Sequence, residues 1–123
     1  MTTTITPTAK KYIIDKGGKI FFAVLGDKII ATVALMPTEN ELTYELTKMA
    51  VKPKYRNKGI GKKLLNKCIE FSNYNGYESI ILYSNKKLKN AIHLYKLFGF
   101  EEIKMEIKSP YSRADIKMIK KFY

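Results

Sequence analysis

The sequence is poor in cysteine and histidine, which build disulfides and many metal sites: its 123 residues include one of each. It also lacks tryptophan. Cys68 alone forms no disulfide framework or cysteine-based metal site within one chain. His93 alone excludes His-rich zinc sites and argues against a Ser/His or Cys/His triad. No apolar run approaches the roughly 18 residues of a membrane span, and "MTTTITPTAKKYI" lacks the basic-then-apolar layout of a signal peptide. The expected location is the cytoplasm.

Arginine is also scarce. Only two of the 23 basic residues are arginine, and with 11 acidic residues the formal net charge is +12. Such a charge suits a nucleic-acid binder or a protein with acidic ligands. Because base-edge and bidentate phosphate recognition prefer arginine, the lysine-rich composition instead favours an ordinary solvated surface. That surface still favours anionic ligands.

Hydrophobic residues make up 46% of the chain, which is enough for one domain with a buried core. We find no repeat and no low-complexity linker. Turn residues and alternating apolar residues divide the first half into a short helix and three strands. The predicted bounds are Thr8–Asp15 for the helix, and Lys19–Leu25, Lys28–Met36 and Glu41–Val51 for the strands.

The period of apolar residues changes at Ile60, where an amphipathic helix begins that Gly76 ends. A short apolar strand, a second helix and two further strands follow. Their predicted bounds are Glu78–Ser84 for the strand, the Asn85–Phe100 segment for the helix, and Phe100–Lys108 and Arg113–Phe122 for the last strands. The order β-β-β-α-β-α-β-β predicts an α/β fold, a mixed central sheet with flanking helices and a parallel crossover at its centre.

Between the third strand and the long helix stands "YRNKGIGKKLL", Tyr55–Leu65. Helix starts carry unpaired N–H groups and the positive end of the helix dipole. Glycines let a ligand approach the backbone closely, so the turn predicts a phosphate site. The P-loop pattern G-x-x-x-x-G-K-[ST] is absent, and a dinucleotide fingerprint would need glycine where Leu64 stands. A turn that needs glycine only for its shape is the alternative.

With these elements in place, the residues resemble the GCN5-related N-acetyltransferase (GNAT) family. The family signature [Q/R]-x-x-G-x-[G/A] stands here as Arg56-Asn57-Lys58-Gly59-Ile60-Gly61. A second family feature, an Asn-containing helix ending in "LY…GF", reads "NAIHLYKLFGF" from Asn90 to Phe100. The motifs follow in the family's order and at about its spacing. We therefore expect one acetyltransferase-like domain over residues 1–123, with a short N-terminal segment, 1–18, and an acetyl-CoA-binding core, 19–123.

The resemblance implies acetyl-CoA-dependent acetylation of an amine. In the family, the turn binds the pyrophosphate of coenzyme A, the preceding strand pairs with the pantetheine arm, and an amide of that strand hydrogen-bonds the thioester carbonyl. An asparagine of the second motif contacts the cofactor. The positions carried over are Arg56, Asn57, Lys58, Gly59, Ile60, Gly61 and Lys62 for the turn, Met49, Ala50 and Val51 for the strand, and Asn85 and Asn90 for the second segment.

Two residues carry over as catalysts. The resemblance implies that Tyr95 lies near the sulfur and protonates the leaving thiolate; its alternative is a core aromatic residue. Some members use a glutamate eleven residues before the signature as the base, which is Glu45 here; its alternative is a cross-strand partner of a lysine. His93 lies two positions from Tyr95, on another helix face, and Cys68 fits the apolar stripe of its helix and is expected in the core.

The N-terminus departs from the family. Members normally begin with a strand and one or two helices that wall the acceptor site, whereas about 18 residues precede the hairpin here. We expect those elements to be absent or shortened, the acceptor side to be open, and a homodimer to complete it. Two alternatives stay open: a catalytically inactive acetyl-CoA-binding or interaction module of the same fold, and a nucleic-acid-binding protein. Neither motif indicates which amine accepts the acetyl group, although repulsion between the positively charged protein and polyamines disfavours polyamines as acceptors.

Overall fold

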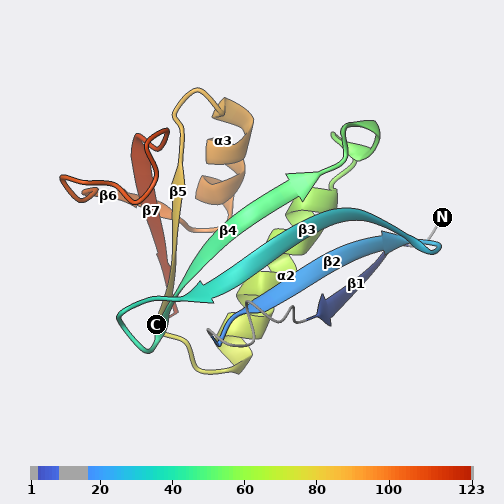
Figure 1. Cartoon of the computed structure of the whole chain (residues 1–123), viewed down its shortest axis with the longest axis horizontal. Helices are drawn as coiled ribbons and strands as arrows, with labels where there is room; N and C mark the ends of the chain where they lie inside the picture. The colour runs from blue at the N-terminus through green and yellow to red at the C-terminus, as the bar shows by residue number, and fades with distance from the viewer. Residues whose placement is uncertain (1–2, 9–16, 123) are drawn as a thin grey trace.

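A single seven-stranded sheet forms the frame of the protein, with strand order β1-β2-β3-β4-β5-β7-β6 (Figure 1). The computed structural model describes residues 3–8 and 17–122. The strands are β1 Thr3–Thr8, β2 Lys19–Leu25, β3 Lys28–Pro37, β4 Thr43–Val51, β5 Ser79–Ser84, β6 Glu101–Ile103 and β7 Ile116–Lys121. The helices are a 3₁₀ turn, η1 Pro53–Tyr55, and two α-helices, α2 Ile60–Tyr74 and α3 Lys89–Leu97.

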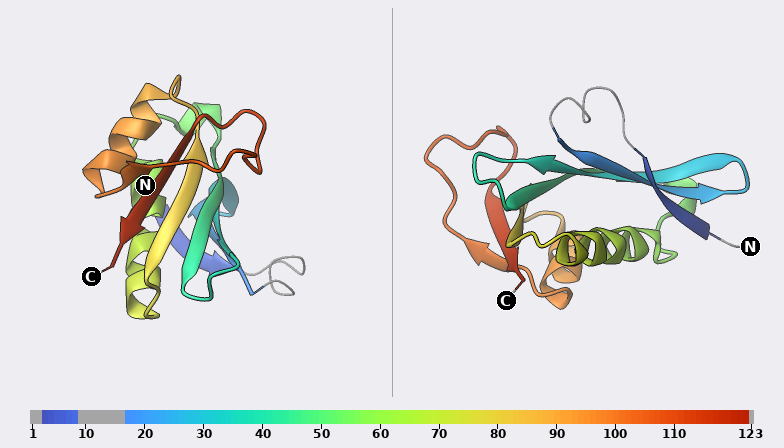
Figure 2. Two further views of the ribbon diagram at one scale, coloured as in Figure 1. Left: turned by 90° about the vertical axis from the view of Figure 1, so that its left-hand side faces the viewer. Right: turned by 90° about the horizontal axis from the view of Figure 1, so that it is seen from below.

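Strands β4 and β5 are parallel, and the other neighbours in the sheet are antiparallel. Helix α2 is the crossover between β4 and β5, and α3 leads from β5 to β6. Figure 2 shows both helices on the same face of the sheet, as two successive right-handed crossovers require. The predicted parallel crossover is thus confirmed.

The core lies between α2 and strands β2, β3 and β4. Leu64, Leu65 and Cys68 on α2 are fully buried, as predicted for Cys68, and meet Phe21 and Leu35 of the sheet in one cluster. Ser72, one turn beyond Cys68, is also buried, and its hydroxyl donates to the Cys68 carbonyl at 2.8 Å. That bond satisfies a polar group that would otherwise cost stability.

The periodic elements are confirmed with small shifts of their ends. β2 has its predicted bounds, β3 runs one residue longer, and β4 begins at Thr43 rather than Glu41. The strand predicted over Phe100–Lys108 is wrong beyond Ile103. The carboxylate of Glu106 accepts hydrogen bonds from Tyr83 on β5 and Lys117 on β7. These bonds hold segment 104–115 against the sheet instead of extending it as a strand.

The N-terminal strand is present in short form. β1 pairs antiparallel with β2, from Thr3 opposite Leu25 to Thr8 opposite Ile20. This strand was not predicted, although β-branched threonine and isoleucine suit a strand and proline is tolerated at an edge. The helix predicted over Thr8–Asp15 lies outside the described residues except for Thr8, which ends β1. Within residues 3–8 and 17–122, no helix precedes β2.

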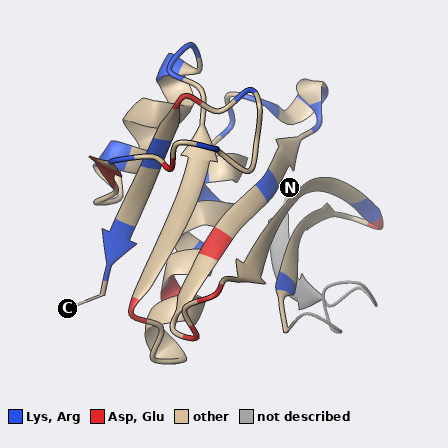
Figure 3. Ribbon diagram, turned by 60° about the vertical axis from the view of Figure 1, so that its left-hand side comes forward, with Lys and Arg blue, Asp and Glu red and all other residues tan. Residues whose placement is uncertain are grey.

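Basic residues are spread over strands, helices and turns, as Figure 3 shows. This distribution agrees with the lysine-rich solvated surface expected from composition. None of the helices in the described ranges is long and apolar enough to cross a membrane.

The core predicts a large effect for Leu64→Ala. The side chain is fully buried against the sheet, so its truncation should lower the free energy of unfolding by about 2–5 kcal/mol. Asn73→Ala, at an exposed position of the same helix, should change it by less than about 0.5 kcal/mol. Urea unfolding followed by circular dichroism measures both. Equal effects would contradict this placement of the core.

Candidate active site

Strands β4 and β5 separate after a short pairing. Thr43–Glu45 pair with Ser79–Ile81, and from there each strand continues without the other. On its other side β4 carries a bulge: Thr32 faces Ala50 while Ala34 faces Thr47. Two residues, Lys48 and Met49, therefore stand opposite one. A bulge bends its strand and increases its twist, which favours the divergence of β4 from β5.

The bulge is built on unusual backbone. Lys48 has φ 56°, a left-handed conformation that costs energy for a non-glycine residue. The Thr32 side chain on β3 donates to the Lys48 carbonyl at 3.2 Å and helps to hold it. The strain thus lies at the point where the sheet opens.

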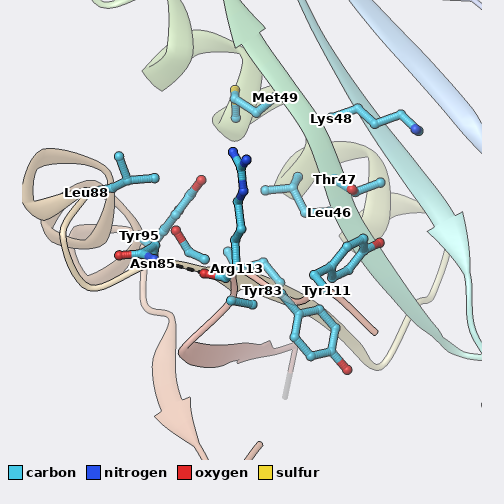
Figure 4. A pocket seen from close by; sticks show the side chains of 13 residues that line it. Leu46, Thr47, Lys48, Met49, Tyr83, Asn85, Leu88, Tyr95, Tyr111 and Arg113 are labelled. Atoms are coloured by element: carbon cyan, nitrogen blue, oxygen red, sulfur yellow. Dashed lines mark hydrogen bonds between the residues drawn. The ribbon is translucent and has the colours of Figure 1, made fainter. Parts of the chain in front are cut away.

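A pocket of about 330 Å³ occupies the gap between the two strands. Figure 4 shows its walls, which come from β4, β5, α3 and segment 104–115. The lining residues are Leu46, Thr47, Lys48, Met49, Leu82, Tyr83, Ser84, Asn85, Leu88, Tyr95, Tyr111, Arg113 and Ala114. The volume suits a small molecule or one end of a larger one.

Tyr95 brings a proton to this pocket. It projects from α3, and its ring lies 5.8 Å from that of Phe100, centroid to centroid. Burial raises the pKa of the Tyr95 hydroxyl above its ordinary value of 10. The side chain therefore stays protonated at neutral pH and can act as a proton donor.

The glycine turn lies at the other end of β4's unpaired stretch, before α2. Gly59 caps the helix with φ 78°, and no side chain bonds the free N–H groups of the first turn. A Cβ added to Gly59 or Gly61 would meet no atom within 4 Å. The first turn of α2 contains no acidic residue. Open space, free amides and nearby lysines together fit a polyphosphate group.

Some of the other candidate residues line the pocket, and others lie outside it. Met49 and Asn85 line the pocket with Tyr95. Asn90 is exposed on the first turn of α3 and is not among the lining residues. Arg56 donates from Nε to the Val51 carbonyl at 3.0 Å, which braces the end of β4 against the turn.

Glu45 also lies outside the lining residues. Its carboxylate accepts a hydrogen bond of 2.6 Å from the Tyr111 hydroxyl. Its observed partner is thus a tyrosine rather than the lysine considered from the sequence. Because Tyr111 lines the pocket, this bond links the Glu45 carboxylate to the pocket wall.

Sequence reasoning missed the residues that segment 104–115 contributes, above all Arg113 and Tyr111. The rings of Tyr111 and Tyr83 are tilted by 60° to each other, with centroids 5.4 Å apart, and Tyr83 donates to Glu106 at 2.5 Å. One signal was available: Arg113 is the second of only two arginines. Its meaning depended on where the segment folds, which no local pattern revealed.

The Glu106 contacts predict a pH dependence. The hydrogen bond from Lys117, and then that from Tyr83, lower the pKa of Glu106 from 4.5 to about 2. A carboxyl group with a depressed folded-state pKa stabilises the fold above its unfolded pKa. The contribution of Glu106 should therefore be lost as the pH falls from about 4.5 toward 2.

An NMR titration of the glutamate carboxyl carbons measures this directly. Lys117→Met should return the pKa of Glu106 toward 4.5, whereas Lys108→Met, at an exposed position of segment 104–115, should not change it. An ordinary Glu106 pKa in the unmodified protein would contradict the bonding described here.

Comparisons with known proteins agree with this geometry. The family model of the acetyltransferase (GNAT) domain matches residues 16–102. N-acetylaspartate synthetase of Xenopus tropicalis is 38% identical over 96 residues, covering 76% of this chain and 35% of that protein. The chain spans about a third to a half of the curated relatives it matches.

Solved structures show the same fold. A GNAT-family acetyltransferase from Staphylococcus aureus superposes with a TM-score of 0.76 and 29% identity, covering 89% of this chain and 71% of its own. A Bacillus subtilis acetyltransferase in complex with CoA gives 0.77 at 20% identity, covering 98% and 99%. The chain belongs to the GNAT family of acetyltransferases.

Proposed function

We propose that this protein is an N-acetyltransferase that moves an acetyl group from acetyl-CoA to an amine. The observation that carries the proposal is the pocket in the β4–β5 gap, which is lined by both Met49 and Tyr95. The glycine turn, which leaves the first N–H groups of α2 without a side-chain cap, follows the same strand. The names of the relatives, N-acetylaspartate synthetase and N-acetyltransferase 8, support the same chemistry.

The turn from Arg56 to Lys62 holds the pyrophosphate of acetyl-CoA in this proposal. Its free amides and open glycines suit phosphate oxygens. Beyond Glu45, the side of β4 that faced β5 has no strand partner. Except for the Val51 carbonyl, which accepts from Arg56 Nε, the backbone groups of Met49, Ala50 and Val51 on that side can pair with the pantetheine arm, as strand edges do. The bound CoA in the Bacillus subtilis structure belongs to a protein of the same fold.

Acetyl-CoA supplies the acetyl group as a thioester, whose sulfur leaves as a thiolate. Tyr95 donates its proton to that sulfur, and its raised pKa keeps the proton available. The Met49 amide holds the carbonyl oxygen that gains charge. Glu45 accepts the proton that the amine loses, directly or through water. Its 2.6 Å bond to Tyr111 keeps the carboxylate beside the pocket wall.

The second candidate function is an acetyl-CoA-binding module without catalysis. Within residues 3–8 and 17–122 no helix precedes β2, and this observation motivates the second candidate. Release of free thiol with a panel of amines separates the two, because cofactor binding without transfer to any amine favours the module. The homodimer, the cytoplasmic location and the cofactor contact of Asn90 stay predictions.

The phosphate site predicts weaker cofactor binding in Gly61→Leu. The added side chain would enter open space at the start of α2, where the phosphate oxygens are expected. Loss of one charged hydrogen bond should weaken acetyl-CoA binding about tenfold to a hundredfold by calorimetry. Gly61→Ala is the matched control, with a smaller expected effect. Equal affinity in all three proteins, each with a normal melting temperature, would refute this site.

The proton donor predicts slower turnover in Tyr95→Phe. Removing the hydroxyl should lower kcat about 10²- to 10⁴-fold, with acetyl-CoA binding unchanged. In the parent enzyme, the raised pKa should keep this donor active through mildly alkaline pH. Tyr74→Phe is the control, since Tyr74 is 83% exposed on α2. A Tyr95→Phe enzyme with full kcat would remove Tyr95 from the mechanism.

A further inference from the structure

Arg113 is the charged side chain directed into the pocket. Figure 4 shows its guanidinium rising between Tyr95 and Leu46 toward Met49, while the ammonium of Lys48 points away from the other side chains. The pocket lining contains no aspartate or glutamate. Although Arg113 is an exposed residue, its guanidinium is the cation that the pocket presents beside the proposed reaction site.

Arg113 has no acidic partner in the described part of the chain. The ion pairs of Lys86 with Glu102 and of Lys117 with Glu106 do not include it. A guanidinium in a protein wall commonly binds a carboxylate or phosphate through two parallel hydrogen bonds. For Arg113, a bound ligand would supply that anionic partner.

The carboxylates close to the pocket are bound elsewhere. Glu45 accepts from the Tyr111 hydroxyl, Glu106 accepts from Tyr83 and Lys117, and Asp115 accepts from the Lys86 amide at 2.7 Å. Each therefore helps to fix segment 104–115 in place.

The backbone around Arg113 is held from two sides. Asn85 donates from Nδ2 to the Arg113 carbonyl at 2.9 Å. The Asp115 amide donates to the Ser84 carbonyl at 3.0 Å. Because this backbone is already held in place, less of the chain must be ordered when a ligand binds, which lowers the entropic cost of binding.

We propose that the acceptor is a small amine that also carries a carboxylate, such as a free amino acid, and that Arg113 binds that carboxylate. The proposal rests on the proposed acetyl transfer. A planar guanidinium matches a carboxylate better than a lysine does, and this chain uses lysine for 21 of its 23 basic residues. Free polyamines fit poorly beside a cation with no acid in the lining.

Arg113 is separate from the phosphate site. The glycine turn lies before α2, and none of the turn residues is among the pocket lining. The cofactor's phosphates and the acceptor's carboxylate thus meet different cations. This separation makes the two proposals distinguishable by experiment.

The test compares free amino acids with their C-terminal amides as acceptors, by thiol release from acetyl-CoA. The best acid should exceed its own amide in kcat/KM by about tenfold or more, as a charged hydrogen bond allows. Arg113→Gln should raise KM for the acid about tenfold to a hundredfold and leave KM for the amide unchanged. Arg113→Lys should recover part of the loss. Lys108→Gln, which removes a charge from the same segment outside the pocket, is the control.

Product binding tests the role of Arg113 even if no turnover is detected. N-acetylglycine should bind the CoA-saturated protein more tightly than N-acetylglycinamide, and only Arg113→Gln should abolish the difference. A preference for amides, spermidine or peptide N-termini would overturn the proposal, and so would a preference for phosphoethanolamine. An acid preference that survives in Arg113→Gln would overturn the role of Arg113. Failure of the protein to bind acetyl-CoA would instead refute the proposed function, so calorimetry with acetyl-CoA accompanies each variant.

Discussion

The site depends on the fact that two neighbouring parallel strands stop pairing in the middle of a sheet. After Glu45 and Ile81, β4 and β5 diverge, and backbone groups that would normally bond each other are left without a strand partner. Unpaired backbone groups inside a protein are costly, so a sheet opens in this way only where something else fills the gap. The strained residue Lys48 and the bulge around it mark where the opening is imposed.

The opening persists because elements on both sides are anchored independently. On one side, α2 ties β4 to the core through Leu64 and Leu65. On the other, β5 pairs with β7 along its whole length. Tyr83 and Tyr111 then fix segment 104–115 across the gap through carboxylates that come from different elements. The backbone of β4 thus forms the part of the site that suits a cofactor. Side chains of segment 104–115 form the part that suits an acceptor.

This division also explains what the sequence could predict. Strands β2 and β3, helix α2 and the crossover follow from local periodicity and turn residues, and their bounds were nearly right. The glycine turn was found because three properties, glycine, charge and a helix start, coincide within a few residues. Residues 104–108 were misread as strand, and the last strand was expected from Arg113 rather than from Ile116. The reason is that Tyr83 and Lys117, which lie outside this segment, hold it through Glu106. For the same reason Arg113 could be noticed as a rarity but not placed.

The single cysteine has a practical consequence. Cys68 is fully buried under the sheet, and burial raises the pKa of its thiol well above the ordinary value. Thiolate is the reactive form of cysteine, so the folded protein offers almost nothing for a disulfide reagent or an alkylating agent to modify. In the proposed reaction, free thiol that appears in the mixture would then come from coenzyme A. Labelling of Cys68 would report that the core has opened.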